Sequence, residues 1–168
     1  GENWVLDVFK RGGDIYCATA SQMFGVPVEK HGINGNLRQK GKVATLALGY
    51  QGGANALIQM GALNMGIPEE ELPDIVSKWR TANPNIVQLW EKMNKLAIHT
   101  IDTGNTTYIN GLTLRTELDI IHGLSYFSIE LPSGRKLFYC QPSIGTNRWG
   151  HPSIEYKGNN QTTKKWET

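Results

Sequence analysis

Four side chains in the segment 36–53 have types and spacing suited to binding a polyanion next to a flat ring. Arg38, Lys42, Leu46 and Tyr50 follow one another at intervals of four residues. Because four residues are close to one helical turn, these side chains form a slowly drifting stripe on one predicted helix. A nucleoside triphosphate has the same order of chemistry: an anionic tail, a sugar and a base. We therefore interpret the segment as a nucleotide-binding helix.

The rest of this predicted helix indicates how it is positioned. Asn36 is the expected N-cap, and the helix N-terminus adds partial positive charge near Arg38, which favours an anion there. Gly41 costs about 1 kcal/mol relative to Ala inside a helix, so it predicts a close neighbour or a bend. The packed face is predicted to hold Leu37, Ala44 and Leu48. The alternative interpretation is an ordinary amphipathic helix whose cations are solvated.

The part of the chain before Gly104 has the apolar periodicity and turn residues of a helical domain. Helices are expected to begin near residues 4, 14, 36, 54, 68 and 84, and the helix from residue 54 is expected to run to Met65. Asp14 is a good N-cap for the second helix, and Gly25 is its expected end. The segment 26–35 is predicted to be a loop. We expect Trp4, Trp79 and Trp90 to lie in the core, because they fit apolar stripes.

After Gly104 the pattern changes to that of β-hairpins. One hairpin is predicted over 106–114 with Asn110–Gly111 as its tight turn, and another over 126–140. A last strand is expected at 153–156, followed by a loose polar tail. We predict an α+β fold, mainly α-helical, in which residues 1–104 form a helical part and residues 105–168 a segment with β-hairpins. The hairpins need the helices to bury one face, so we predict a single unit, 1–168.

Composition limits the function classes. The chain has 168 residues and a net charge of +2, so binding to nucleic acid must come from local clusters. Cys17 and Cys140 are too few for a disulfide framework, and two free thiols in a reducing compartment are the preferred interpretation. No apolar run approaches the roughly 18 residues that a membrane span needs, so no membrane partner is expected.

The stripe and its surroundings resemble family A (polymerase I-like) DNA polymerases, nearest to phage and prophage members. The fingers helix of that family carries Arg-x-x-x-Lys-x-x-x-[aromatic]-x-x-x-Tyr, which Arg38, Lys42 and Tyr50 match in register. Upstream, residues 13–25 resemble the family's Gly-x-Asp-Ile-His-x-x-Thr-Ala-x-x-x-Phe-Gly segment.

Two further segments carry the resemblance. Residues 67–84 resemble the helices that follow the fingers, and residues 134–137 resemble the family's Gly-Arg-Arg-x segment before the palm resumes. The similarity covers most of the chain and is weakest from residue 104 to 130. It implies a fingers-type helical subdomain followed by β-hairpins that lead back to the palm.

The resemblance also implies residue roles. Arg38 and Lys42 would hold the triphosphate of the incoming dNTP, and Lys42 would act in catalysis by offsetting charge or donating a proton at the pyrophosphate leaving group. Tyr50 would lie near the templating base and the nascent pair. Arg135 would touch the primer–template backbone.

Three positions depart from the family pattern. Leu46 stands where the family has a Phe or Tyr that stacks on the sugar. Tyr16 replaces the His that assists phosphate binding, and its hydroxyl is the candidate substitute. Gln51 interrupts the usual Tyr-Gly pair after Tyr50. Leu46 and Tyr16 remain substrate-binding candidates.

Two-metal phosphoryl transfer needs carboxylates that hold both ions about 4 Å apart. No His in the chain is followed by Asp, as in the family's His-Asp-Glu block. The resemblance places the two carboxylate blocks before Gly1 and after Thr168. We therefore expect a monomeric fragment of a longer protein, without metal ligands of its own and unable to extend DNA alone. The implied partners of the parent are Mg²⁺, dNTP and primer–template DNA, in the cytoplasm of a bacterial host.

A second hypothesis is a non-enzymatic helical module with a β-hairpin that binds nucleic acid or protein. It uses the same cations but needs no triphosphate. Trp149 and Trp166 lie among cations, and aromatic side chains among cations can stack single-stranded bases. The alternative for these two residues is a loop anchor or a residue that docks against other parts of the parent protein. The neighbouring charged or titratable residues are Arg148, His151, Lys164 and Lys165.

Overall fold

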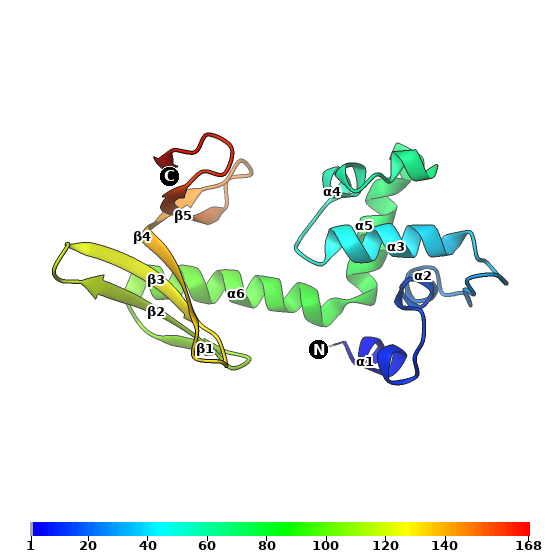
Figure 1. Cartoon of the computed structure of the whole chain (residues 1–168), viewed down its shortest axis with the longest axis horizontal. Helices are drawn as coiled ribbons and strands as arrows, with labels where there is room; N and C mark the ends of the chain where they lie inside the picture. Colours follow the sequence, from blue (N-terminus) through cyan, green and yellow to red (C-terminus); the bar gives the residue numbers. More distant parts are fainter. Residues whose placement is uncertain (1) are drawn as a thin grey trace. The chain divides into compact units, whose positions relative to one another are not determined.

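A computed structural model describes residues 2–168 as an assembly of helices followed by strands (Figure 1). The α-helices are α1 Asn3–Lys10, α2 Ile15–Phe24, α3 Leu37–Leu48, α4 Ala54–Gln59, α5 Leu72–Ala82 and α6 Pro84–Thr103. The 3₁₀ helices are η1 Leu63–Met65 and η2 Glu69–Glu71. The strands are β1 Thr107–Ile109, β2 Leu112–Asp119, β3 Leu124–Glu130, β4 Lys136–Thr146, β5 Pro152–Asn159 and β6 Trp166–Glu167. The predicted α+β class with helices first and hairpins second is confirmed.

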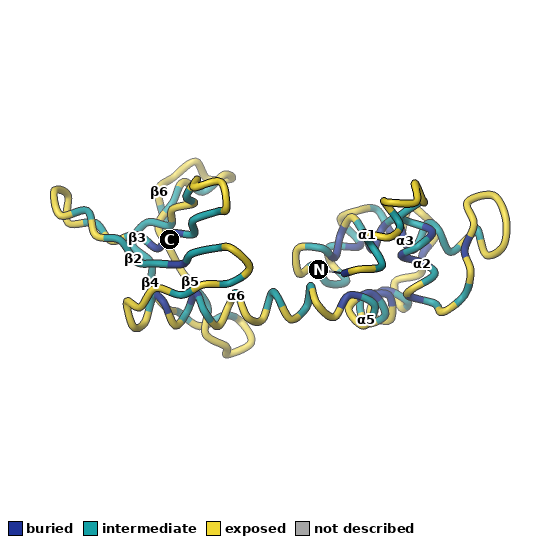
Figure 2. Tube along the Cα trace, turned by 90° about the horizontal axis from the view of Figure 1, so that it is seen from below, coloured by how far each residue is buried: buried dark blue, intermediate teal, exposed yellow. Residues whose placement is uncertain are grey.

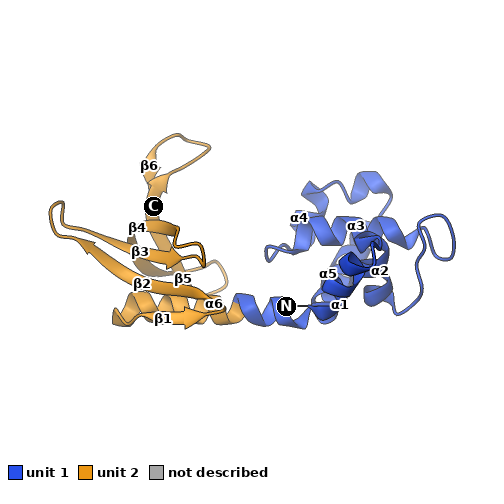
Figure 3. Cartoon of the chain, turned by 60° about the horizontal axis from the view of Figure 1, so that its bottom comes forward, with its two compact units in different colours: residues 1–90 blue, residues 91–168 orange. Residues whose placement is uncertain are grey.

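The chain forms two compact units, residues 1–90 and 91–168 (Figure 3). The predicted change from helix to strand near Gly104 is confirmed, since α6 ends at Thr103. The limit between the units lies earlier, at residue 90 inside α6. A helix of 20 residues is about 30 Å long, so its two ends can contribute to different cores. The interpretation of the whole chain as one domain stays a prediction.

The core of the first unit is built mainly by α3 and α5, which carry buried segments in Figure 2, and α4 adds Leu57. Its fully buried large side chains are Val43, Leu48, Leu57, Leu72 and Ile75. Trp79 is buried and stacks on Trp90, with 5.9 Å between the ring centroids. Trp4 is half-buried and donates a hydrogen bond from Nε1 to the carbonyl of Ala82 (3.2 Å). The prediction that Trp79 and Trp90 belong to the core is confirmed.

Three details of the helical part differ from expectation. The helix predicted over 54–65 is interrupted, because α4 ends at Gln59 and Gly61 takes a φ of +86°. Asn36 has a helical backbone and its side chain makes no capping hydrogen bond, so the predicted N-cap is wrong. Helix α1 buries no residue fully, and Trp4, which was expected in the core, is half-buried. Phe9 of the same helix is 62% exposed.

The strands form one antiparallel meander with the order β1-β2-β3-β4-β5-β6. The Asn110–Gly111 turn between β1 and β2 has φ values of +49° and +78°, as a tight hairpin turn requires. The predicted hairpins and the last strand near Ser153 are confirmed. Ala97 of α6 is buried together with Leu114 and Phe127 of the sheet, so α6 covers the core of this unit.

Two parts of the sheet were not expected. Strand β2 continues to Asp119 and pairs with β3 along its length, which leaves Ile120 and Ile121 exposed in the connecting turn. The predicted loose tail is wrong, because β6 pairs with β5 through Asn159 and Trp166. Strand β6 is brought back to β5 by a turn in which the Asn160 side chain accepts a hydrogen bond from Thr162 N–H and donates one to Glu167.

Both cysteines, Cys17 and Cys140, are free, as preferred from the sequence. Among residues 2–168, no helix combines the length and the apolar character needed to cross a membrane.

Candidate functional site

Helix α3 lies against α2 at Gly41. A Cβ at Gly41 would lie 2.2 Å from the carbonyl oxygen of Tyr16 and 2.9 Å from the Cβ of Ala20. One turn later, Thr45 Oγ1 donates to the carbonyl of Gly41 (2.8 Å) and lies 3.1 Å from the hydroxyl of Thr19. The close neighbour predicted for Gly41 is therefore confirmed, and it is the α2 backbone. This close packing determines how far α3 is shifted along α2, and so places Arg38 next to the start of α2.

Arg38 is held by two groups from α2. Its Nε donates to Asp14 Oδ2 (2.8 Å), and its guanidinium carbon lies 5.2 Å from the centroid of the Tyr16 ring. The other Asp14 oxygen caps α2 by accepting from the backbone N–H groups of Tyr16 (2.9 Å) and Cys17 (3.1 Å). The predicted N-cap role of Asp14 is confirmed. One carboxylate thus both starts α2 and positions the guanidinium of α3.

The pKa shifts agree with this geometry. Burial alone would raise the pKa of Asp14, but the hydrogen bond from Arg38 and the bonds from the two backbone N–H groups hold it below its usual value. The hydrogen bond to Asp14 raises the pKa of Arg38. Burial, with the charge of Asp14 as a second cause, raises the pKa of the Cys17 thiol. Both members of the ion pair are therefore charged near neutral pH.

Lys42 lies one turn beyond Arg38 on α3 and differs from it in having no carboxylate partner among residues 2–168. It is half-buried. Lys40 on the same helix is, in contrast, paired with Glu71. An unpaired, half-buried ammonium next to an arginine is a favourable arrangement for an incoming anion. The ion pair of Arg38 uses Nε and leaves both terminal nitrogens outside it.

The end of the stripe differs from the prediction of a single helix. Helix α3 ends at Leu48, so Tyr50 lies in the following turn, where it is 95% exposed. Gln51 takes a φ of +63°, a conformation that glycine adopts more readily. Gly52 comes next, and a Cβ there would lie 2.1 Å from the carbonyl of Ala47. The chain therefore folds back tightly against α3, and this reversal carries Tyr50 off the helix.

Of the predicted substrate-binding residues, the structure brings Arg38 into contact with Tyr16, and Lys42 follows Arg38 one turn later on α3. Leu46 continues the helical stripe and is 43% exposed. Arg135, the predicted DNA-binding residue, lies in the second unit, in the exposed turn between β3 and β4. There Gly134 takes a φ of +80° and the carbonyl of Arg135 accepts from Leu131 N–H (2.8 Å).

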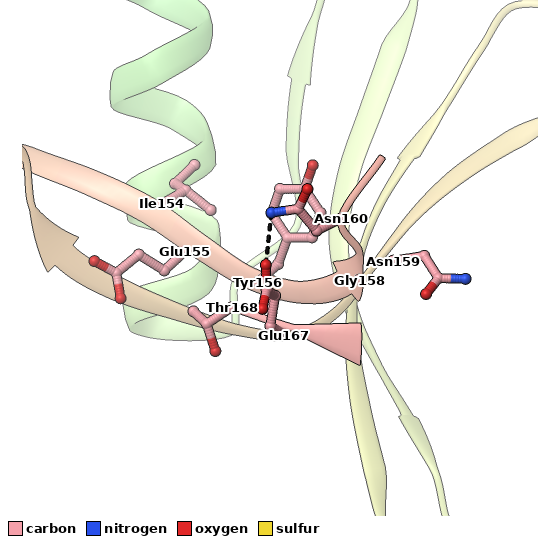
Figure 4. A pocket seen from close by; sticks show the side chains of 8 residues that line it. All are labelled: Ile154, Glu155, Tyr156, Gly158, Asn159, Asn160, Glu167 and Thr168. Carbon is pink, nitrogen blue, oxygen red and sulfur yellow. Dashed lines mark hydrogen bonds between the residues drawn. The ribbon is translucent and has the colours of Figure 1, made fainter. Parts of the chain in front are cut away.

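No group of three His, Cys, Asp or Glu side chains that could hold a metal ion is found within residues 2–168. A pocket of about 520 Å³ lies along β5 and β6 (Figure 4). Its charged lining residues are the carboxylates Glu155 and Glu167, without a cation, so it is unsuited to phosphate. Compared with this pocket, the cations of α3 are the better candidate for binding a triphosphate.

The residue that sequence reasoning missed is Asp14 in its second role. The N-cap could be predicted from its position before an apolar run, but no spacing rule connects residues 14 and 38. Only the packing of α2 on α3 brings the two together. The sequence feature that pointed to Asp14 was the resemblance of residues 13–25 to the family segment Gly-x-Asp-Ile-His, in which Asp14 matches the Asp.

Asp14 offers a test of this ion pair through pH. Asn also caps helices, so Asp14→Asn removes the charge and keeps a capping group, whereas Asp14→Ala removes both. We expect Asp14→Asn to lower the free energy of unfolding by about 1 kcal/mol at pH 7, since the pair is partly exposed. A carboxyl with a depressed folded-state pKa stabilises above its unfolded pKa, about 3.9, and loses that contribution as pH falls through the folded pKa.

The measurement is urea unfolding of the wild type and both variants from pH 7 to pH 2. The difference between wild type and Asp14→Asn should be constant above about pH 5 and vanish at the acidic end. The difference in unfolding free energy between Asp14→Asn and Asp14→Ala measures the contribution of the helix cap, and it should remain across the whole pH range. A wild-type to Asn difference that does not change with pH would contradict the ion pair.

The comparison with known proteins agrees with the motif. Over 166 residues, 98% of its length, the chain is 47% identical to the DNA polymerase of Bacillus phage SP02. The chain is similar to part of a phage DNA polymerase. It spans about a quarter of the length of that relative, 25%. No protein-family model matches the sequence.

Proposed function

We propose that this chain is the fingers-containing segment of a family A, template-directed DNA polymerase and that it binds the triphosphate of the incoming dNTP and the nascent base pair. The observation that carries the proposal is the 47% identity to a phage DNA polymerase across 98% of the chain. The side chains at Arg38, Lys42 and Tyr50 fit the three roles that the motif requires, with two cations on α3 and an exposed aromatic ring at its end.

In this function the chain contributes positioning and electrostatics. Lys42, which has no carboxylate partner within the described residues 2–168, contacts the phosphates and offsets the charge that develops on the pyrophosphate. Arg38 contacts them with its terminal nitrogens while Asp14 and Tyr16 hold its orientation. Leu46 packs on the sugar with an apolar surface in place of a ring, and Tyr50 contacts the base pair.

The proposed function needs Mg²⁺, and residues 2–168 contain no group of three His, Cys, Asp or Glu side chains that could hold a metal ion. We propose that the carboxylates that hold Mg²⁺ belong to segments of the parent polymerase on either side of this one. The 168-residue chain should then fail to extend a primer on a template, and measurable template-dependent extension by the purified chain would contradict this part of the proposal.

A second candidate function is a nucleic-acid or protein-binding module without enzymatic activity. One observation favours it: Arg38 already has an anionic partner in Asp14, as expected of a structural helix. In that case the cations of α3 need no triphosphate.

Titration of the chain separates the two functions. Backbone amide shifts are followed while dATP with Mg²⁺, and separately a short DNA duplex, are added. The polymerase function predicts shifts at residues 38–50 with dATP, and these shifts should weaken in Lys42→Ala. No shift at residues 38–50 with dATP, together with shifts at these residues when DNA is added, would support the second candidate instead.

A further inference from the structure

Charge is unevenly distributed along the chain. Residues 131–168 contain six Lys or Arg and two Asp or Glu, whereas residues 1–130 contain eleven and thirteen. Of the six cations, only Lys136 forms an ion pair within residues 2–168, with Glu117. The remaining five are Arg135, Arg148, Lys157, Lys164 and Lys165. The last three strands of the meander therefore carry a local cationic surface that the overall charge of +2 conceals.

The turn between β4 and β5 presents an aromatic ring within this surface. Trp149 is 65% exposed, and the guanidinium carbon of Arg148 lies 4.1 Å from its ring centroid. The side chain of Asn147 accepts hydrogen bonds from the N–H groups of Trp149 and His151, both at 3.0 Å. The backbone adds bonds from Asn147 N–H to His151 O (2.8 Å) and from Gly150 N–H to Asn147 O (2.9 Å). The ring thus projects from a well-ordered turn.

The turn between β5 and β6 has the same construction. The side chain of Asn160 accepts from Thr162 N–H (2.8 Å) and donates to Glu167 Oε1 (2.6 Å), a bond drawn in Figure 4. Two lysines, 164 and 165, precede Trp166, which is 62% exposed on β6. Glu167 of this segment accepts hydrogen bonds from Asn160 and from Thr163 Oγ1 (2.9 Å), and within residues 2–168 it forms no ion pair with either lysine.

We propose that these two turns, residues 147–151 and 160–166, form a binding surface for single-stranded DNA. Bases stack on Trp149 and Trp166, and the lysines and Arg148 contact the phosphates. Strand β5 between the turns has eight residues, a span of about 25 Å, which suits a segment of several nucleotides. Its carboxylate-lined pocket takes no phosphate, so the phosphate contacts are made by the cations of the two turns. The residues of this surface belong to the second unit and those of the proposed triphosphate site to the first. The choice of DNA rather than RNA rests on the proposed polymerase function.

The test is equilibrium binding of a fluorescent 20-residue oligothymidylate to the 168-residue chain, followed by anisotropy. Trp149→Ala and Trp166→Ala should each weaken binding about tenfold, the loss typical of one stacked base. The Lys164→Ala/Lys165→Ala pair should reduce the slope of log affinity against log salt by about 1.4, because each contact to a single strand contributes about 0.7.

Matched controls come from elsewhere in the chain. Phe9 is also 62% exposed, and Lys92 and Lys95 are exposed on α6, so Phe9→Ala and Lys92→Ala/Lys95→Ala should leave affinity and salt slope unchanged. Lys42→Ala should also leave oligothymidylate binding intact, which distinguishes this surface from the triphosphate site. Unchanged affinity in both tryptophan variants, equal losses in the controls, or tighter binding of oligouridylate than of oligothymidylate would overturn the proposal.

Discussion

Lys42→Ala, introduced into a full-length polymerase that carries this segment, should reduce kcat/KM for dNTP incorporation by about 10²- to 10³-fold. The reason is that the Lys42 ammonium has no carboxylate partner among residues 2–168 and lies one turn from Arg38, so it is available to an anion. Loss of one preorganised electrostatic contact to a developing negative charge costs about 3–4 kcal/mol in transition-state stabilisation. Single-nucleotide incorporation under steady-state conditions measures this quantity.

Two other variants serve as controls for the effect of Lys42→Ala on kcat/KM. Lys40→Ala removes a cation from the same helix, but one already neutralised by Glu71, so its effect on kcat/KM should be small. Arg135→Ala removes a cation from an exposed turn and should act mainly on DNA affinity, with a smaller effect on incorporation than Lys42→Ala. A Lys42 variant with a near-normal rate, or one no slower than Lys40→Ala, would count against the assignment.

Gly41→Ala should lower the free energy of unfolding by about 2 kcal/mol, although Ala is the better helix former. The new methyl would meet the Tyr16 carbonyl and Ala20, so α2 and α3 must move apart. Overpacking of this kind costs about 1–3 kcal/mol and exceeds the roughly 1 kcal/mol that Ala regains in helix propensity. Urea unfolding followed by far-UV circular dichroism measures the change. The Arg38–Asp14 contact should weaken in the same variant, because it depends on the same packing.

Gly49→Ala is the matched control, since it makes the same chemical change at the end of the same helix. Gly49 has a φ of −60°, and a Cβ there would meet only Thr45 O, at 3.9 Å. Ala should therefore be accommodated without strain and raise stability by about 0.5–1 kcal/mol. Opposite signs for the two substitutions are the expected result. Equal effects would mean that α2 does not approach α3 as closely as the structure shows.

Features governed by local chemistry could be predicted from the sequence. The Asn110–Gly111 turn, the Asp14 cap of α2 and the end of that helix at Gly25 depend on residues within a few positions of one another. The same is true of the need for a close neighbour at Gly41, although not of which neighbour that is. The conformation of these elements is determined mainly by residue types and their local spacing.

The features that could not be predicted depend on contacts distant in sequence. Nothing near residue 38 indicates that Asp14 will engage its guanidinium, because only helix packing unites them. The end of α3 before Tyr50 follows from the close approach of Gly52 to Ala47. The extension of β2 to Asp119 likewise comes from pairing with β3, since its residues carry no clear alternation of their own.

The central claim is that Arg38 and Lys42 together hold the triphosphate of a nucleotide. The most direct measurement is a crystal structure of a polymerase containing this segment with primer–template DNA and a non-hydrolysable dNTP. The account predicts that Lys42 Nζ and a terminal nitrogen of Arg38 both lie about 3 Å from phosphate oxygens, with Asp14 still bonded to Arg38 Nε. A triphosphate bound away from α3, or one in contact with neither cation, would contradict it.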